Sequence, residues 1–194
     1  MRVIGIDPGL RELGWAILDI NGKKIKLRDF GVIQSQDNGE LAKRVWEIGK
    51  KMEMVFRKWK PDIAGIESVF VWKDPSASLK LGIIVGTCIE IARRKKVEVQ
   101  IISPLYIKSK ITGGDQMADK EKVKKSVIRK LKKFEGKMNG KLAQDIPHHI
   151  TDAISIAISA NLKRSEEKNE NRKKIKIKLQ TDKKLRTKLK SIRI

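Results

Sequence analysis

The chain has 194 residues, a formal net charge of +22 at pH 7 and a single cysteine, Cys88. This length supports one substantial hydrophobic core, and a lone cysteine excludes both a disulfide framework and a thiolate zinc site. We expect no apolar run long enough to span a bilayer and no signal peptide, which predicts a soluble cytoplasmic protein. The excess of Lys and Arg favours a polyanionic partner, with nucleic acid ahead of a membrane surface.

The first predicted strand covers residues 2–7 and ends in an acid. It is rich in β-branched residues, and Pro8-Gly9 breaks it abruptly. A carboxylate carried on rigid backbone to the edge of a sheet lies where catalytic groups are usually placed, so Asp7 is a candidate active-site residue. The alternative is that Asp7 only begins the turn, because Asp before Pro-Gly is common turn chemistry.

The next segments predict an antiparallel start to the sheet, followed by a helix. An apolar run at 13–20 and an alternating segment at 23–34 flank Asn21-Gly22, which is a strong hairpin signal. Apolar residues then recur at helical spacing over residues 41–59, with charged residues between them. This pattern predicts an amphipathic helix that Pro61 ends.

A second short apolar strand, Ile63–Glu67, also ends in an acid. Together with residues 2–7 and the intervening helix it has the form of a crossover unit, in which two parallel strands lie side by side in one sheet. We therefore expect Asp7 and Glu67 to meet at the same edge. Glu67 paired with a lysine, without a catalytic role, is the alternative for this residue alone.

The second half of the chain alternates helices with one further strand. Cys88 falls on the first of these helices and is interpreted as a small buried hydrophobe. Gly82 and Gly86 on the same helix are four residues apart and would let another helix approach closely. The predicted helices cover residues 76–94, 105–111, 119–134 and 148–162, the strand covers 97–102, and a linker covers 135–147.

The C-terminal tail, residues 163–194, differs in composition from the domain predicted for residues 1–162. It holds 14 Lys or Arg against 4 Asp or Glu, a net charge of +10. A segment so charged and so poor in aromatic residues is expected to be disordered, or only partly helical, until it meets a partner. We interpret it as a source of non-specific DNA affinity rather than as a solubilising tail only.

The last predicted helix carries a third candidate group, His148-His149-x-x-Asp152. Helical spacing alone does not choose between the two histidines, since they precede Asp152 by four and three residues. Asp152 alone could simply favour the dipole near a helix N-terminus. Two strand-end acids together with an acid-bearing helix favour a site in which Mg²⁺ neutralises clustered carboxylates and is shared with substrate phosphates. Two such ions would promote phosphodiester hydrolysis by in-line displacement.

Three stretches of the sequence form a recognisable set of motifs. The opening Ile4–Ala16 contains Asp7-Pro8-Gly9 and Gly14-Trp15-Ala16. The second stretch is Ile66-Glu67-Ser68-Val69-Phe70, followed by Ser78–Gly82 and Gly86, and the third is His149–Ala157. In this order they resemble the first, second and last motifs of the RuvC-type Holliday junction resolvases, a family of crossover junction endodeoxyribonucleases. The resemblance covers residues 1–162 and selects His149, rather than His148, as the fourth member of the metal site.

This resemblance implies a ribonuclease-H-like α/β fold, a mixed five-stranded sheet flanked by helices, with the basic tail added. The enzyme would be a homodimer that resolves four-way (Holliday) junctions in DNA recombination and repair, by paired symmetric nicks. It would use two Mg²⁺ ions per subunit, for which Mn²⁺ is expected to substitute. A branch-migration motor complex is a further candidate partner.

The resemblance also implies residue roles. Asp7 would bridge both metal ions, and Glu67, His149 and Asp152 would complete their shells. Lys108 and Lys120 match basic positions near the scissile phosphate; their alternative is a solvated lysine face. Phe70 matches a loop aromatic that stacks on an unpaired base. The alternative for Phe70 is a hydrophobic plug in the dimer interface. Gly82 and Gly86 suit close helix contacts in that dimer.

Two features depart from the family pattern: Trp72, which we cannot assign a role, and the tail.

Competing functions are a less selective branched-DNA endonuclease and a non-catalytic module that binds structured nucleic acid. The module is disfavoured because a binder has no reason to keep buried carboxylates that repel one another. An actin-like nucleotide-hydrolysing fold shares the Ile-Gly-Ile-Asp opening, but it needs two such domains, and 194 residues cannot supply them.

Overall fold

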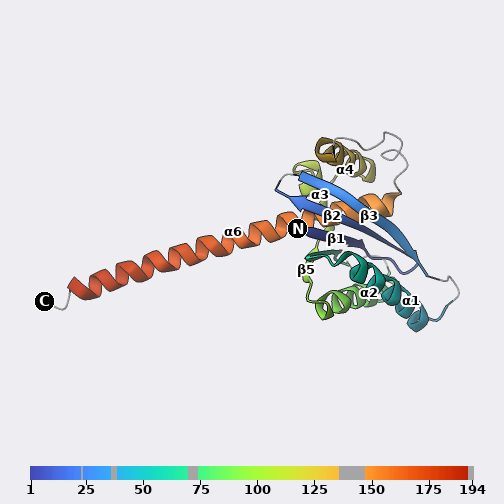
Figure 1. Cartoon of the computed structure of the whole chain (residues 1–194), viewed down its shortest axis with the longest axis horizontal. Helices are drawn as coiled ribbons and strands as arrows, with labels where there is room; N and C mark the ends of the chain where they lie inside the picture. Colours follow the sequence, from blue (N-terminus) through green and yellow to red (C-terminus); the bar gives the residue numbers. More distant parts are fainter. Residues whose placement is uncertain (23, 36–38, 70–73, 136–146, 192–194) are drawn as a thin grey trace. The chain divides into compact units, whose positions relative to one another are not determined.

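The structure is a computed structural model that describes residues 1–22, 24–35, 39–69, 74–135 and 147–191 (Figure 1). The chain divides into two units, Met1–Asn161 and Leu162–Ile194. The first unit holds every strand within the described ranges and nearly all of the buried core. It is therefore the unit in which a site can be built.

A five-stranded mixed sheet forms the centre of the first unit, in the order β3-β2-β1-β4-β5. Antiparallel pairing joins β1 to β2 and β2 to β3, whereas β1–β4 and β4–β5 are parallel. The antiparallel start and the parallel β1–β4 pair were predicted from the residues, and the family resemblance implied a mixed sheet of five strands. The strands are β1 (Arg2–Asp7), β2 (Glu12–Asn21), β3 (Lys24–Gln34), β4 (Ile63–Glu67) and β5 (Glu98–Ile102).

Two chain reversals explain this pairing. A tight turn joins β2 to β3, where Gly22 adopts a positive φ of 57° that disfavours other residues. Between β3 and β4 the chain crosses over through α1 (Leu41–Trp59), and β4 returns parallel to β1. The register pairs Ile6 with Ile66, so the acids that follow them, Asp7 and Glu67, end neighbouring strands at the same edge.

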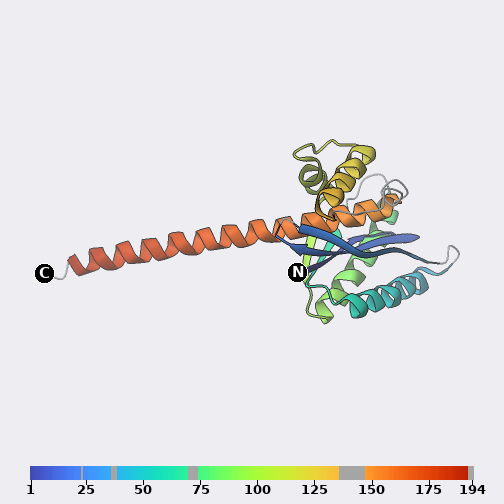
Figure 2. The same ribbon diagram turned by 45° about the horizontal axis from the view of Figure 1, so that its top comes forward.

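Helices α1 and α2 (Pro75–Arg94) cover one face of the sheet (Figure 2). The Asp74 carboxylate caps α2 by accepting a hydrogen bond from the Ala77 N–H at 3.0 Å, next to a proline at the start of the helix. Cys88 is fully buried here, as predicted, and burial raises the pKa of its thiol to about 12. The fully buried side chains between these helices and the sheet include Ile4, Ile6, Leu13, Ile17, Ile48, Met52, Ile66, Ile84 and Cys88.

The opposite face is covered by α4 and by the first turns of α6 (Figure 2). Glycines in the two central strands permit this close approach. A methyl group on Gly5 of β1 would collide with the backbone of Ala153, and one on Gly65 of β4 would lie 2.6 Å from the Cβ of Ala160. The remaining helices are α3 (Pro104–Thr112), α4 (Lys120–Glu135) and α6 (His148–Ser191).

The end of α6 differs from the sequence prediction. The predicted helix ended at residue 162 and left a tail that was disordered or partly helical, whereas α6 continues to Ser191. The physical reason is that residues 163–191 contain no proline or glycine and consist largely of Lys, Arg, Glu and Leu, which are good helix formers. Every residue from 165 to 180 is exposed, so this part of the helix buries no core.

The expectation that no apolar run reaches the length of a bilayer span is wrong for α2. Among the described residues, α2 is the one helix that is long and apolar enough to cross a membrane, judged by length and composition only. The reason is that it carries no charge between Lys80 and Glu90. Helices in the cores of soluble proteins meet the same criterion, and Ile84, Cys88 and Ile91 of α2 are buried in the core.

Candidate active site

The ends of β1 and β4 place two carboxylates at one edge of the sheet. Asp7 is only 16% exposed, and burial raises its pKa, although His149 and Lys120 act in the opposite direction. Burial also raises the pKa of Glu67, to about 7, and the negative charges of Asp7 and Asp152 add to this rise. Asp7 therefore lies close enough to Glu67 for its negative charge to disfavour ionisation of Glu67.

The first turn of α6 adds His149 and Asp152. Strand β2 lies directly against this turn. The approach is so close that a methyl group on Gly14 would collide with the His149 carbonyl oxygen. As a result, Nδ1 of His149 lies 2.9 Å from Oδ2 of Asp7, in a hydrogen bond between residues 142 positions apart. Burial and the charge of Asp7 raise the pKa of Asp152. Of the two histidines that spacing left open, His149 is the one that contacts Asp7.

Two lysines from outside the sheet face the same carboxylates. Lys120 begins α4, and its positive charge offsets part of the rise in the pKa of Asp7, Glu67 and Asp152. Lys108 on α3 acts in the same direction on Glu67. The chain therefore brings positive charge from two separate helices to a cluster of three half-buried acids.

Of the remaining predicted contacts, Phe70 lies outside the described residues, as does Trp72. Gly82 and Gly86 are described: a methyl group on either would meet nothing within 4 Å. They therefore lie on an uncovered face of α2.

The donor set suits a hard divalent cation, because it combines three carboxylates with one imidazole and needs positive charge to relieve repulsion. Within the described ranges, however, no three His, Cys, Asp or Glu side chains stand in a geometry that could hold a metal ion. The Asp7 carboxylate instead pairs with His149. The residues fit a metal in kind and in electrostatics, and the side chains would have to turn to bind it.

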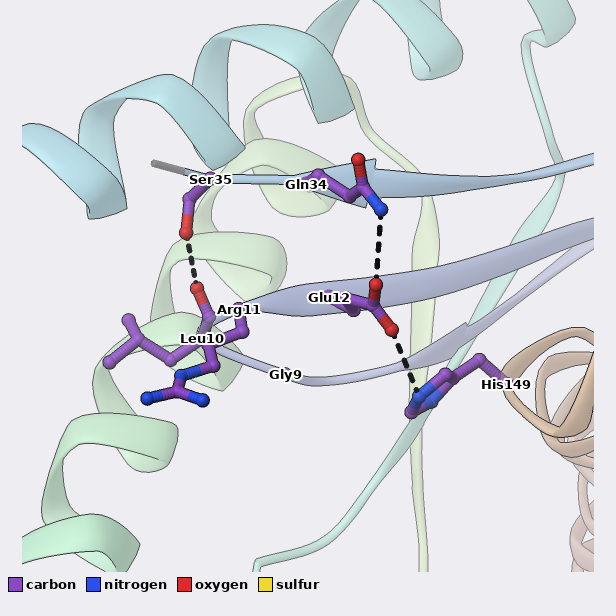
Figure 3. A pocket seen from close by; sticks show the side chains of 7 residues that line it. All are labelled: Gly9, Leu10, Arg11, Glu12, Gln34, Ser35 and His149. Carbon is purple, nitrogen blue, oxygen red and sulfur yellow. Dashed lines mark hydrogen bonds and ion pairs between the residues drawn. The ribbon is translucent and has the colours of Figure 1, made fainter. Parts of the chain in front are cut away.

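Two further residues of this site were not predicted from the sequence. Oε2 of Glu12 lies 3.4 Å from Nε2 of His149, and Nε2 of Gln34 donates a hydrogen bond to Oε1 of Glu12 at 3.0 Å (Figure 3). They line a surface hollow of about 690 Å³ together with Gly9, Leu10, Arg11, Ser35 and His149. The hollow extends the site along the start of β2.

Comparison with known proteins decides the family. A sequence profile described as crossover junction endodeoxyribonuclease RuvC matches residues 3–160. The chain belongs to the RuvC family. RuvC of Prochlorococcus marinus is 32% identical over 133 residues, which cover 68% of this chain and 84% of that protein. RuvC of Cereibacter sphaeroides is 35% identical over 121 residues, which cover 62% of this chain and 71% of that protein.

Solved structures agree with this assignment. RuvC of Thermus thermophilus in complex with a Holliday junction substrate superimposes with a TM-score of 0.71 at 26% identity, covering 82% of this chain and 92% of that one. The fowlpox virus resolvase, also solved with Holliday junction DNA, has a TM-score of 0.53 at 16% identity, which shows the fold alone. The ribonuclease-H-like fold expected from the sequence is therefore confirmed, as is membership of the RuvC family.

Proposed function

We propose that this protein is a crossover junction endodeoxyribonuclease that resolves four-way DNA junctions by paired, symmetric nicks. Membership of the RuvC family supports the activity, and the junction substrate of the Thermus thermophilus relative supports the substrate. The net charge of +22 suits a polyanion. A branch-migration motor as partner stays a prediction from family resemblance alone.

The observation that carries the proposal is the meeting of Asp7, Glu67 and Asp152 from three separate elements, with His149 and two lysines around them. Buried carboxylates that repel one another lower the stability of the folded state, so a cluster of them in a cleft indicates a function. A protein that only bound DNA would gain nothing from negative charge at the phosphate site. A nuclease site needs that charge to hold cations beside the phosphate.

We assign two divalent cations per subunit to this cluster, with Mg²⁺ as the preferred ion. Asp7, Glu67, Asp152 and His149 would hold them, since hard cations take oxygen ligands and accept imidazole. When bound, such ions activate a water molecule and stabilise the leaving 3′ oxygen of the phosphodiester.

The residues of the chain itself supply binding and orientation. Lys108 and Lys120 place positive charge beside the carboxylates, where they can hold the scissile phosphate and balance charge that develops on it. In the metal-free structure His149 is hydrogen-bonded to Asp7 through Nδ1, which keeps its ring beside the carboxylates. Both strand-end acids sit on paired backbone, Asp7 opposite Gly14 and Glu67 opposite Ile102, so each carboxylate is carried by a rigid part of the sheet. Phe70 is assigned to the crossover bases by resemblance only.

We further propose a homodimer formed through α2. Leu79 is 70% exposed and Ile83 is 40% exposed, while Gly82 and Gly86 have open space where a second helix could approach. Exposed apolar side chains around two glycines four residues apart are typical of a close helix–helix contact. A dimer would also present two active sites to the two symmetry-related strands of a junction.

The test is cleavage of a panel of DNA substrates. We expect a mobile four-way junction to be cut with Mg²⁺ and left intact with EDTA, and duplex to be left intact in both. Equal cutting of flaps and replication forks would favour the less selective nuclease. Binding of the junction without cutting in Mg²⁺ or Mn²⁺ would contradict the proposal and favour the non-catalytic module.

A further inference from the structure

A second carboxylate faces His149 from beyond the cluster just described. The Asp7 carboxylate pairs with Nδ1 of the imidazole at 2.9 Å, whereas Glu12, at the start of β2, lies 3.4 Å from Nε2. The His149 ring is thus bracketed by carboxylates at both of its nitrogens. His149 and Glu12 are each 45% exposed, so the pair lies at the open side of the site.

Glu12 is itself held in place. The side-chain amide of Gln34, its partner across the β2–β3 ladder, donates a hydrogen bond to the other Glu12 oxygen at 3.0 Å. Figure 3 shows the resulting chain, in which Gln34 and His149 approach the two oxygens of Glu12 from different elements. The orientation of Glu12 is therefore set by the sheet and does not depend on His149 alone.

An imidazole that binds a metal through one nitrogen usually donates the N–H of the other to a carboxylate, which fixes its tautomer and ring orientation. Asp7 cannot serve in this way if its oxygens bind the same ions. Glu12 can, because it faces the opposite nitrogen. In the metal-free structure the Nδ1–Asp7 hydrogen bond holds a proton between those two atoms. Once cations occupy the Asp7 oxygens, an N–H at Nε2 directed at Glu12 would leave the lone pair of Nδ1 free to bind metal.

We propose that Glu12 is a positioning residue: held by Gln34, it orients the His149 ring through Nε2 so that Nδ1 serves as the metal-binding atom. This inference rests on the proposed metal site. It is not a claim about stability, since an ion pair between partly exposed side chains contributes little to folding. The inference therefore predicts altered metal binding with nearly unchanged thermal unfolding.

The experiment is titration of the full-length protein with Mn²⁺, followed by the electron paramagnetic resonance signal of free Mn²⁺. Glu12→Gln keeps the shape of the side chain and removes its charge. We expect about tenfold weaker binding of one ion, the lower end of the loss typical for such outer partners. Glu53→Gln is the matched control, because Glu53, on α1, is also a surface carboxylate and pairs with Lys95 at 3.0 Å. It should bind Mn²⁺ like the parent protein.

A double-mutant cycle separates positioning from general electrostatics. In a His149→Ala background, Glu12→Gln should cause no further loss, because the ring it orients is gone. An equal loss in both backgrounds would overturn the inference and assign Glu12 a purely electrostatic effect. Unchanged affinity of the single variant would also overturn it. If Glu12→Gln is poorly folded, Gln34→Ala tests the same chain and should weaken binding by a smaller factor.

A spectroscopic signature checks the tautomer directly. The chain has only two histidines, so ¹⁵N-detected NMR of the Mg²⁺-loaded protein can resolve His149. We expect its proton on Nε2, and a mixture of tautomers in Glu12→Gln. A proton on Nδ1 in the parent protein would contradict the inference. Failure of the parent protein to bind Mn²⁺ would instead remove the metal site, and with it the proposed function.

Discussion

Asp7 links the two halves of the site at the scale of single residues. It pairs with His149 on α6, and its charge raises the pKa of both Glu67 and Asp152. Asp7 and Glu67 could be predicted from the sequence, because each ends a short apolar strand. Glu12 could not, since a glutamate at the start of a strand resembles any surface charge until its contact with His149 is known.

Asp7→Asn tests the carboxylate at the centre of the site. The substitution keeps the shape of the side chain but removes the charge that a cation requires, so cleavage of a four-way junction should fall by about a thousandfold or more. Junction binding should persist, because the lysines are untouched. Cleavage and gel-shift assays on one preparation measure both. Asp29→Asn, on β3, is the control that should cut normally, and retained cutting by Asp7→Asn would remove Asp7 from the site.

Glu67 should make the stability of the protein depend on pH. Its pKa of about 7 lies above that of an exposed glutamate, so the folded, metal-free state holds a proton that the unfolded state has already lost. The free energy of unfolding should therefore fall as pH rises from about 4.5 to about 7, with the shifted Asp7 and Asp152 adding to the fall. Glu67→Gln should flatten this dependence in urea titrations with EDTA present. An equal slope in both proteins would contradict the assigned burial.

At the scale of elements, periodicity predicted most of the fold. Apart from the C-terminal end of α6, strands and helices were located to within a few residues, because apolar spacing and Pro or Gly breaks mark them. The register between β2 and β3 was harder to predict from the sequence. A regular hairpin that begins with the pair Asn21–Lys24 would place Glu12 opposite Ile33. A bulge between Ile17 and Leu18 moves the partner of Glu12 to Gln34, which creates the contact seen in the site.

Helix α2 carries the element-scale prediction. Ile83→Lys places a charge on the uncovered face between Gly82 and Gly86, and it should convert a dimer into single chains because a buried lysine at a helix contact is costly. Light scattering after size exclusion measures the mass. Met54→Lys, at an exposed position on α1, should leave the mass unchanged. A parent protein that runs as one chain at micromolar concentration would contradict the proposed dimer.

At the scale of the whole molecule, charge is distributed unevenly along the chain. Residues 163–194 hold +10 of the total of +22, and those from 165 to 180 are exposed on every face of the helix. Composition alone indicated the charge but not the helix, because high net charge is typical of disordered segments as well. The sequence feature that favours a helix here is the absence of proline and glycine from residues 163–194.

The tail prediction follows from this charge. Deleting residues 164–194 should leave the rate of junction cleavage under saturating conditions within about twofold, since the proposed site lies in the first unit. It should also flatten the dependence of log Kd on log salt, because each phosphate contact contributes roughly 0.9 to the slope. Fluorescence anisotropy from about 50 to about 300 mM salt measures this slope for the full-length protein and for the deletion variant. An unchanged slope would show that the tail does not contact DNA.

The most direct test of the account is to map both nick positions on a fixed four-way junction, strand by strand, with Mg²⁺ present. If the carboxylate cluster is a nuclease site used by paired subunits, two nicks will appear at symmetry-related positions, with ends that a ligase can seal. Unpaired or scattered nicks, or none in any divalent metal, would contradict it.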